Sequence, residues 1–459
     1  MKTLQRFTLI GVMLSAAATG AFAQTIHVSC TSVFWTDPHQ RIACLEALLS
    51  QEKYHFTLAS LPPSNGFGPG LVLIDRKRGT WGKPARNYEL DLSATGAVTT
   101  NSSWFSGADV TLMPSFNDHS TSEDPGELIS DAERQWQQSL VHAGAAHRSV
   151  RTLYFYGSGS RSPSRRYVYS EDDTYGDVDA RIPITRWLVA SGKSEVRASS
   201  LPGVADPTAV ALNFAPAAIP GITAQPIYLN NGFGVETKLL RTSSRKLVEL
   251  PVGDPHYARL IDFEFNNNIG YGWHQPSDGS SFAYRQFRFD GDERAVLRFR
   301  LRNSFHADQH PLAYLLCQYS NKKTDKCNFG QIDIKSRLIL SQASGANQVP
   351  FYLQPTLGGT DIEGNVTLRG YDNYRFRGPD VALLQFEYGV PVWDPFGVYV
   401  FYDVGTVGST PASLSLKQFR QDGGFGLSVR LRGNVVAQTY YAFGAGHGGR
   451  WNYNFAKTF

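Results

Sequence analysis

The chain ends in the stretch WNYNFAKTF, residues 451–459, in which bulky aromatic and polar side chains alternate. The aromatic positions are Trp451, Tyr453, Phe455 and Phe459, and Lys457 interrupts the aromatic series near the end. Successive side chains of a β-strand point to opposite faces, so this stretch predicts a strand with one apolar and one polar face. Residues 261–266, 297–302 and 425–431 alternate in the same way. Such strands occur in soluble sandwiches and in outer-membrane barrels, and alternation alone does not separate the two.

The number and spacing of these segments favour the barrel. We expect sixteen strands, at 69–79, 86–99, 104–114, 166–183, 188–198, 226–239, 257–273, 281–290, 294–306, 311–320, 328–342, 379–391, 397–407, 419–431, 435–446 and 449–459. Connections after even-numbered strands are mostly short. All the long ones except 239–257 follow odd-numbered strands, at 114–166, 198–226 and 342–379. This asymmetry and an even strand number, which puts both chain ends in the periplasm, are typical of bacterial outer-membrane barrels.

We therefore predict an all-β fold, a 16-stranded antiparallel transmembrane β-barrel. The last strand should pair with the first, because an unpaired strand without Pro is an aggregation hazard and closure removes both edges. Composition agrees with this class and excludes others. Lys+Arg number 44 against Asp+Glu 40, a net charge of +4 that gives no nucleic-acid footprint. Outside the N-terminus, no uncharged apolar run reaches the roughly 18 residues of a membrane-spanning helix.

The N-terminus has the pattern of an export signal. Lys2 and Arg6 precede an apolar stretch, and the small-residue site 21–23 predicts a mature protein that starts at Gln24. We divide the chain into a signal peptide at 1–23, a short periplasmic or plug segment at 24–64, and the barrel at 65–459. An amphipathic helix is expected at 38–51 in the short segment. A second helix is expected at 127–141, within a polar loop insertion.

The four cysteines fall into two local pairs, and export brings them to an oxidising compartment. We predict the disulfides Cys30–Cys44 and Cys317–Cys327, the second of them in a periplasmic turn. No second close Cys or His pair has the spacing of metal ligands, so no metal site is expected.

The connection 342–379 carries the most specific motif, Leu368-Arg369-Gly370-Tyr371. It resembles the Arg-Gly-aromatic motif in the sixth extracellular loop of the bacterial surface antigen superfamily, the BamA and TamA type of outer-membrane assembly barrel. Glu387 and Asp403 match the acidic positions of that family in the next two strands. The resemblance extends over about 65–459, includes Phe155-Tyr156-Gly157, and is strongest at 349–408. It implies a long sixth loop that is folded into the lumen.

Strand alternation supports the match, because it turns Leu384, Phe386, Tyr388, Val398, Val400 and Tyr402 outward to lipid and Gln385, Glu387 and Asp403 inward. A guanidinium can bridge two carboxylates, so Arg369 is the expected partner of both acids. The motif then either pins the fold or handles a substrate, and the sequence leaves both readings open. Members of the family carry periplasmic domains, the POTRA domains, before the barrel. Segment 24–64 is too short for one, which implies a separate periplasmic partner.

Enzyme activity is not expected. Residues 157–161 lack the spacing of a nucleophile elbow, and no His-Glu-x-x-His motif occurs. Three functions remain, all at the outer membrane of a Gram-negative cell, among its lipids and without a cofactor. One is assembly or translocation of an unfolded or secreted client protein through a weak seam, flanked by glycines at 66, 68, 70, 444, 446, 448 and 449. The second is a gated or anion-preferring pore lined by Arg298, Arg300 and Arg302. The third is a structural barrel without transport.

Overall fold

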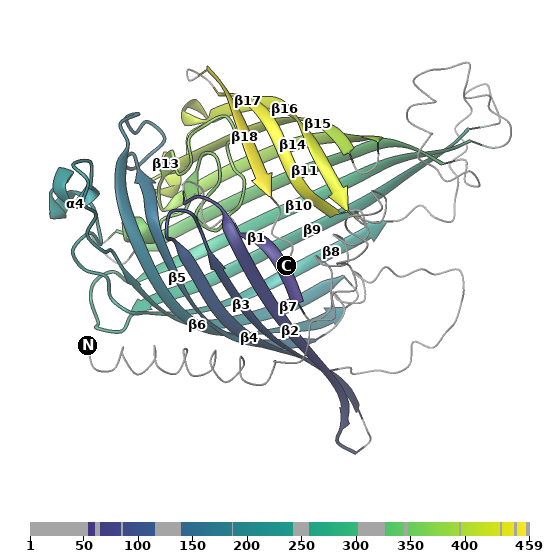
Figure 1. Cartoon of the computed structure of the whole chain (residues 1–459), viewed down its shortest axis with the longest axis horizontal. Coiled ribbons are helices and arrows are strands. Elements are labelled where there is room, and N and C mark those ends of the chain that lie inside the picture. The colour runs from purple at the N-terminus through teal and green to yellow at the C-terminus, as the bar shows by residue number, and fades with distance from the viewer. Residues whose placement is uncertain are drawn as a thin grey trace, which may run out of the picture.

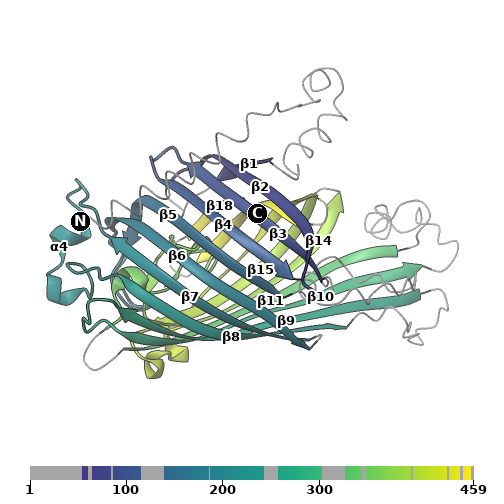
Figure 2. The same ribbon diagram turned by 90° about the horizontal axis from the view of Figure 1, so that it is seen from below.

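The computed structural model describes residues 54–59, 65–83, 86–114, 139–185, 187–241, 257–301, 326–343, 348–393, 396–431, 434–444 and 448–455. Within these ranges the chain forms one sixteen-stranded sheet in which every neighbouring pair is antiparallel and strand order follows the chain. Figures 1 and 2 show that the sheet curls round, so that β2–β6 lie across from β11–β16. No helix in these ranges is long and apolar enough to span a membrane.

The strands of the large sheet are β1 Tyr54–Ala59, β2 Gly68–Trp81, β3 Arg86–Val98, β4 Trp104–Pro114, β5 Leu140–Phe155, β6 Tyr167–Thr185, β7 Leu188–Ser200, β8 Tyr228–Arg241, β9 Tyr257–Pro276, β10 Tyr284–Leu301, β11 Lys326–Ala343, β14 Asp380–Trp393, β15 Phe396–Gly408, β16 Arg420–Leu431, β17 Asn434–Gly444 and β18 Gly448–Phe455. The connection between β11 and β14 contains a second, two-stranded sheet of β12 Thr356–Leu357 and β13 Phe376–Arg377. The short helical elements are α4 Val210–Asn213, η1 Pro216–Ala218, η3 Phe351–Leu353, η4 Pro411–Ser413 and η5 Leu416–Gln418.

Alternation of side chains gives the sheet two different faces. In β15 the burial of successive residues alternates, with Val400 51% exposed on the outer face and Asp403 fully buried on the inner face. Leu384, Phe386, Val398 and Tyr402 are exposed on the outer face as well, and Gln385 is buried on the inner one. The predicted phase of β14 and β15 is therefore confirmed. Among the described residues, the apolar clusters gather inside the curl, around the connection 344–379.

The sheet has the predicted number of strands, but two of them differ from the prediction. The sequence predicts a single long connection here with a helix at 127–141. Leu140 and Val141, at the end of that range, begin strand β5 instead, and 127–138 lie outside the described residues. Its stretch Ala143-Gly144-Ala145-Ala146 is small on both faces, so it shows no contrast in hydrophobicity. Strand β1 lies ahead of residue 65, so the sheet begins earlier than the proposed domain boundary.

Two expected strands have no counterpart of their own in the described part of the sheet. The segments 281–290 and 294–306 form one continuous strand, β10, because the polar stretch Asp290–Glu293 pairs with both neighbours without a turn. The expected strand at 311–320 lies outside the described residues. As a result, β11 is still the eleventh strand of the sheet, and 344–379 is still the sixth connection at its end. The expected helix at 38–51 also lies outside the described residues.

The predicted separation of long and short connections is wrong. We call the end of the sheet that carries 99–103, 156–166 and 344–379 the loop end, and the end where β1 begins and β18 finishes the terminal end. The connections 115–139, 242–256 and 302–325 leave β4, β8 and β10 at the terminal end, so long connections occur at both ends. The prediction failed because missing β5 merged two connections at opposite ends into one.

Candidate functional site

The connection 344–379, which we call the inner loop, is tied together by its own backbone. β12 pairs with β13, and the amide of Gly359 donates to the carbonyl of Leu368 over 2.8 Å while Thr367 donates back to Gly359 over 2.8 Å. Gly358 has φ 112°, a conformation that a side chain would strain. Asp361 accepts the amides of Glu363 at 3.0 Å and Asn365 at 2.7 Å and so closes the tip. The inner loop is therefore a compact unit that can be positioned as a whole.

Arg369 joins the inner loop to two strands of the wall. Its Nε and Nη2 donate to the two carboxylate oxygens of Asp403, each over 2.8 Å, and its Nη1 donates to Glu387 over 2.6 Å. Its backbone amide donates to Asp403 over 3.2 Å, and its guanidinium carbon lies 3.7 Å from the ring centroid of Phe401. The structure thus brings together the three residues that the sequence singled out. Their functional role stays a prediction.

Burial makes this ion-pair cluster a strong constraint. The Arg369 side chain is 6% exposed and Asp403 is fully buried, whereas Glu387 is 25% exposed. Burial lowers the pKa of Arg369, but the hydrogen bonds and charges of Asp403 and Glu387 outweigh this effect and hold that pKa above its ordinary value. The guanidinium is therefore charged at any physiological pH, and this one cation pairs with both acids.

The neighbours of Arg369 in the motif explain why the loop lies so close to the wall. A Cβ atom on Gly370 would lie 2.7 Å from the Cβ of Asp422 in β16 and 2.7 Å from the amide nitrogen of Gly444 in β17, so only glycine fits here. Leu368 is fully buried, and the hydroxyl of Tyr371 donates to the carbonyl of Gln421 over 3.2 Å. All four motif residues thus contribute to one contact with the wall.

The inner loop also reaches the last strand, β18. The Arg450 guanidinium donates to the Asp372 carboxylate, and the Asn452 amide donates to the carbonyl of Arg369 over 3.4 Å. The sheet order begins with β1 and ends with β18, and no pairing between these two strands is found in the described ranges. The predicted closure is therefore not seen here, with residues 456–459 outside those ranges.

A second ion-pair cluster on the opposite wall was missed by the sequence analysis. Asp173 in β6 accepts hydrogen bonds from Arg148 over 2.6 Å and Arg197 over 2.8 Å, and Arg148 also donates to the carbonyl of Ile362 in the inner loop over 3.2 Å. Arg377 of the loop donates to the Tyr169 hydroxyl in β6 over 2.7 Å. No local signal could reveal these contacts, because the register of β5, β6 and β7 creates them.

The remaining inner wall carries charges of both signs. Cross-strand pairs join Arg181 to Glu236, Lys238 to Glu264 at 3.1 Å and Arg294 to Asp333 at 2.9 Å. Of the predicted pore arginines, Arg302 and the side chains of Arg298 and Arg300 lie outside the described residues, so the anion-preferring pore stays a prediction.

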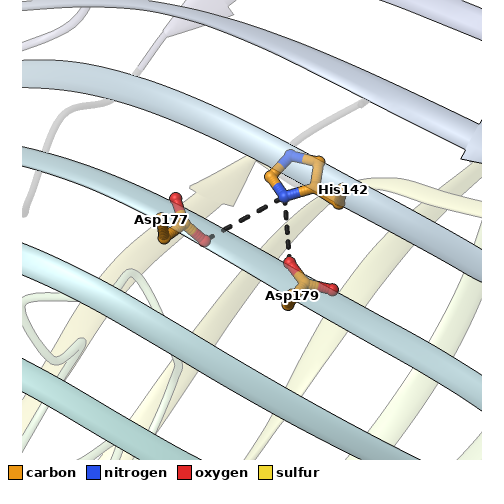
Figure 3. Close-up of side chains that lie close together, drawn as sticks. All are labelled: His142, Asp177 and Asp179. Carbon is orange, nitrogen blue, oxygen red and sulfur yellow. Dashed lines mark hydrogen bonds and ion pairs between the residues drawn. The ribbon is translucent and has the colours of Figure 1, made fainter.

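His142, Asp177 and Asp179 form a further polar group on this wall, with ligand atoms within 4.8 Å of one another (Figure 3). His142 Nδ1 lies 2.9 Å from Asp179, and Lys193 lies 3.4 Å from Asp177. His142 and Asp179 are 37 positions apart in the chain, so their spacing gave no metal motif. These side chains already satisfy one another, and the expected absence of a metal site stays a prediction.

Other predicted positions fall at the margins of the described structure. Trp451 and Tyr453 point outward, with 60% and 74% exposure, whereas the Phe455 side chain and Phe459 are not described. Phe155 and Tyr156 are buried, and Gly157 has φ 97°. Cys30, Cys44, Cys317 and the side chain of Cys327 also lie outside the described residues, so both disulfides stay predictions.

Comparisons with known proteins give a match at the level of shape. No family model and no curated protein sequence matches the chain. Among solved structures, it is similar to BamA from Haemophilus ducreyi lacking POTRA domains 1–3, with TM-score 0.46 and 12% identity over 90% of this chain and 76% of that one. It is also similar to CdiB from Acinetobacter baumannii, with TM-score 0.42 and 10% identity over 91% of this chain and 68% of that one. Function must therefore come from the chain's own residues.

Proposed function

We propose that the chain is an outer-membrane β-barrel of the bacterial surface antigen type, which inserts or translocates client proteins and has no catalytic role. The observation that carries the proposal is the buried bridge from Arg369 to Glu387 and Asp403. This bridge fixes a long loop inside a sheet whose outer face is apolar. Its arginine belongs to the Arg-Gly-aromatic motif, on which the resemblance to that family rests.

The outer face supports a membrane location. Large apolar side chains are exposed on strand after strand, including Val178, Ile182, Phe233, Leu384, Val400, Phe425 and Phe443. Such an extended apolar surface is unfavourable in water, whereas lipid would cover it. Charged side chains on the inner face, such as Arg181, Lys238 and Arg294, pair with acids of other strands, as expected for a lumen.

Strand direction supports an orientation. β1 starts and β18 finishes at the terminal end, so both chain ends leave the sheet there. The sequence predicts an export signal, and a barrel that inserts from the periplasm keeps its termini on that side. We therefore assign the terminal end to the periplasm and the loop end to the cell exterior. A separate protein in the periplasm is the partner proposed for the terminal end.

The seam between β1 and β18 is the proposed route for a client. These two strands share no pairing in the described ranges, and the inner loop contacts β18 through Arg450 and Asn452. Gly68, in the strand next to β1, has no space for a side chain, because a Cβ would lie 1.9 Å from the carbonyl oxygen of Val98. By contrast, buried apolar clusters contain the inner loop residues Phe351, Leu357 and Leu368, so an open central pore is less well supported.

A cross-linking experiment tests this function. One cysteine is placed in β1 and one in β18, the pair is oxidised in living cells, and each single-cysteine variant serves as the matched control. We expect seam-locked cells to lose specific outer-membrane or secreted proteins in quantitative mass spectrometry and to regain them on reduction. Identical proteomes in locked and single-cysteine cells would exclude the seam as a route. An ion current that persists after Arg369→Ala would instead favour the pore.

A further inference from the structure

A groove on the outer face of the sheet combines apolar and cationic side chains. It has a volume of about 410 Å³ and lies over β9, β10 and β11, below the turn that contains η4. Its lining includes Tyr271, Arg285, Phe287, Leu340, Gln342 and Pro411. Arg285 pairs across the sheet with Trp273 and with Gln342, both at outward positions, so its side chain belongs to the outer face.

The level of the groove along the barrel axis follows from two observations. Arg285 is the second residue of β10, immediately after the 277–283 connection, so it lies at the rim of the loop end. An outward aromatic cluster lies beside it, in which the ring centroids of Tyr271 and Trp273 are 5.1 Å apart and those of Phe233 and Trp273 are 5.6 Å apart. Aromatic belts of this kind mark the level of lipid headgroups in membrane proteins.

Within the part of the chain that the structure describes, Arg285 is a cation without a partner. No hydrogen bond or ion pair joins its guanidinium to any residue in the described ranges, unlike the inward Arg288 and Arg294, which pair with Asp290 and Asp333. A lone arginine on the lipid face is unfavourable in the hydrocarbon but is tolerated at the interface, where its planar donors can bind a phosphate. The exposed Gln342 beside it offers a further amide donor.

We propose that this groove binds a phosphorylated glycolipid of the outer leaflet, with its phosphate on Arg285 and Gln342 and its acyl chains along Phe287 and Leu340. The choice of the outer leaflet rests on the orientation given under the proposed function, which places the loop end at the cell exterior. The charge of the phosphate complements the guanidinium of Arg285, and the apolar side chains of Phe287 and Leu340 offer a surface for acyl chains.

Native mass spectrometry of the purified full-length barrel tests the site. The protein in detergent micelles is titrated with diphosphoryl lipid A, and separately with phosphatidylglycerol and phosphatidylcholine. We expect a lipid A adduct whose affinity falls about tenfold in Arg285→Gln, the loss expected for a charge-assisted hydrogen bond, and falls less in Arg285→Lys. Lys77→Gln is the matched control, because Lys77 is an exposed cation on the same outer face at the terminal end, paired with Asp75.

Each outcome is decisive. Lipid A binding that is unchanged in Arg285→Gln, or lowered equally in Lys77→Gln, would overturn the site while leaving the barrel and its function intact. If phosphatidylglycerol binds with the same affinity as lipid A, and Arg285→Gln weakens both equally, the choice of an outer-leaflet glycolipid is overturned. Heat-dependent gel migration is recorded for wild type and for every variant. If the wild-type protein migrates identically with and without heating, it is not a folded membrane barrel, and the proposed function and the lipid site both fail.

Discussion

Removing Arg369 should reveal how strongly the inner loop is bound to the wall. Arg369→Ala deletes three charge-assisted side-chain hydrogen bonds, two to Asp403 and one to Glu387. Asp403 is fully buried and would remain as an uncompensated charge, whereas Glu387 is a quarter exposed and can be hydrated. Breaking a buried pair by removing one partner costs about 3–5 kcal/mol, so we expect a loss near this range, lowered by any water that reaches Glu387.

The two acids should differ in their coupling to Arg369. Glu387→Gln removes a partly exposed charge and keeps an acceptor, so we expect it to cost about 1.5 kcal/mol, the lower limit for a hydrogen bond to a charged group. Asp403→Asn should cost more, because Asp403 accepts from two guanidinium nitrogens and from the Arg369 amide. Arg369→Lys should recover only part of the loss, since an ammonium cannot fork across two carboxylates.

The measurement is a double-mutant cycle in detergent micelles. Folded and unfolded protein are separated as distinct gel bands across a urea series, which gives the free energy of unfolding for wild type, each single variant and each double variant. Interaction energies of about 0.5–3 kcal/mol are expected for residues in one ion-pair network, with the Asp403 cycle larger than the Glu387 cycle. Strictly additive losses in both cycles would show that the three side chains do not act together and would refute the reasoning.

Three shorter predictions concern the rest of the chain. Unheated protein should migrate differently from boiled protein in detergent gels and should fractionate with the outer membrane; identical migration would contradict the barrel. Cys317 and Cys327 should be joined in a disulfide, so unreduced peptide mapping should find them linked, and free thiols at both positions would count against it. Gly370→Ala should destabilise the fold by about 1–3 kcal/mol through overpacking against Asp422 and Gly444, while Gly96→Ala, at a position where a Cβ meets no atom within 4 Å, should change little.

The sequence predicts the local features of this fold well, because they depend on contrast between neighbouring residues. In β14 and β15 the alternation of Leu384, Gln385, Val400 and Asp403 fixes which side chains face lipid and which face inward, and the structure agrees. The same method cannot detect β5, where residues 143–146 are all small. Because β1 was missed, the connections before β5 were assigned to the wrong ends, and missing β5 as well restored the assignment for the connections from β6 to β10.

The candidate site shows a different limit. Arg369 and Asp403 are 34 positions apart, and nothing in their local sequence pairs them; the family resemblance supplied the connection. The cluster of Arg148, Asp173 and Arg197 has no counterpart in the motif, and it forms only because β5, β6 and β7 are in a particular register. Long-range ion pairs of this kind follow from the complete fold and cannot be read from spacing.

The two ion-pair clusters together argue for the seam as the route of a client. The inner loop is bound to β14 and β15 through Arg369, and to β5 and β6 through Ile362 and Arg377. Moving it out of the lumen would break several hydrogen bonds to charged groups at once, each contributing about 1.5–3 kcal/mol, and would expose the buried apolar clusters as well. Separating β1 from β18 breaks no strand pairing in the described ranges. We propose that the contacts of Arg450 and Asn452 let the fixed loop hold β18 while a client passes beside it. We therefore propose that the inner loop is a stationary support for the last strand and that the seam is the part of the barrel that moves.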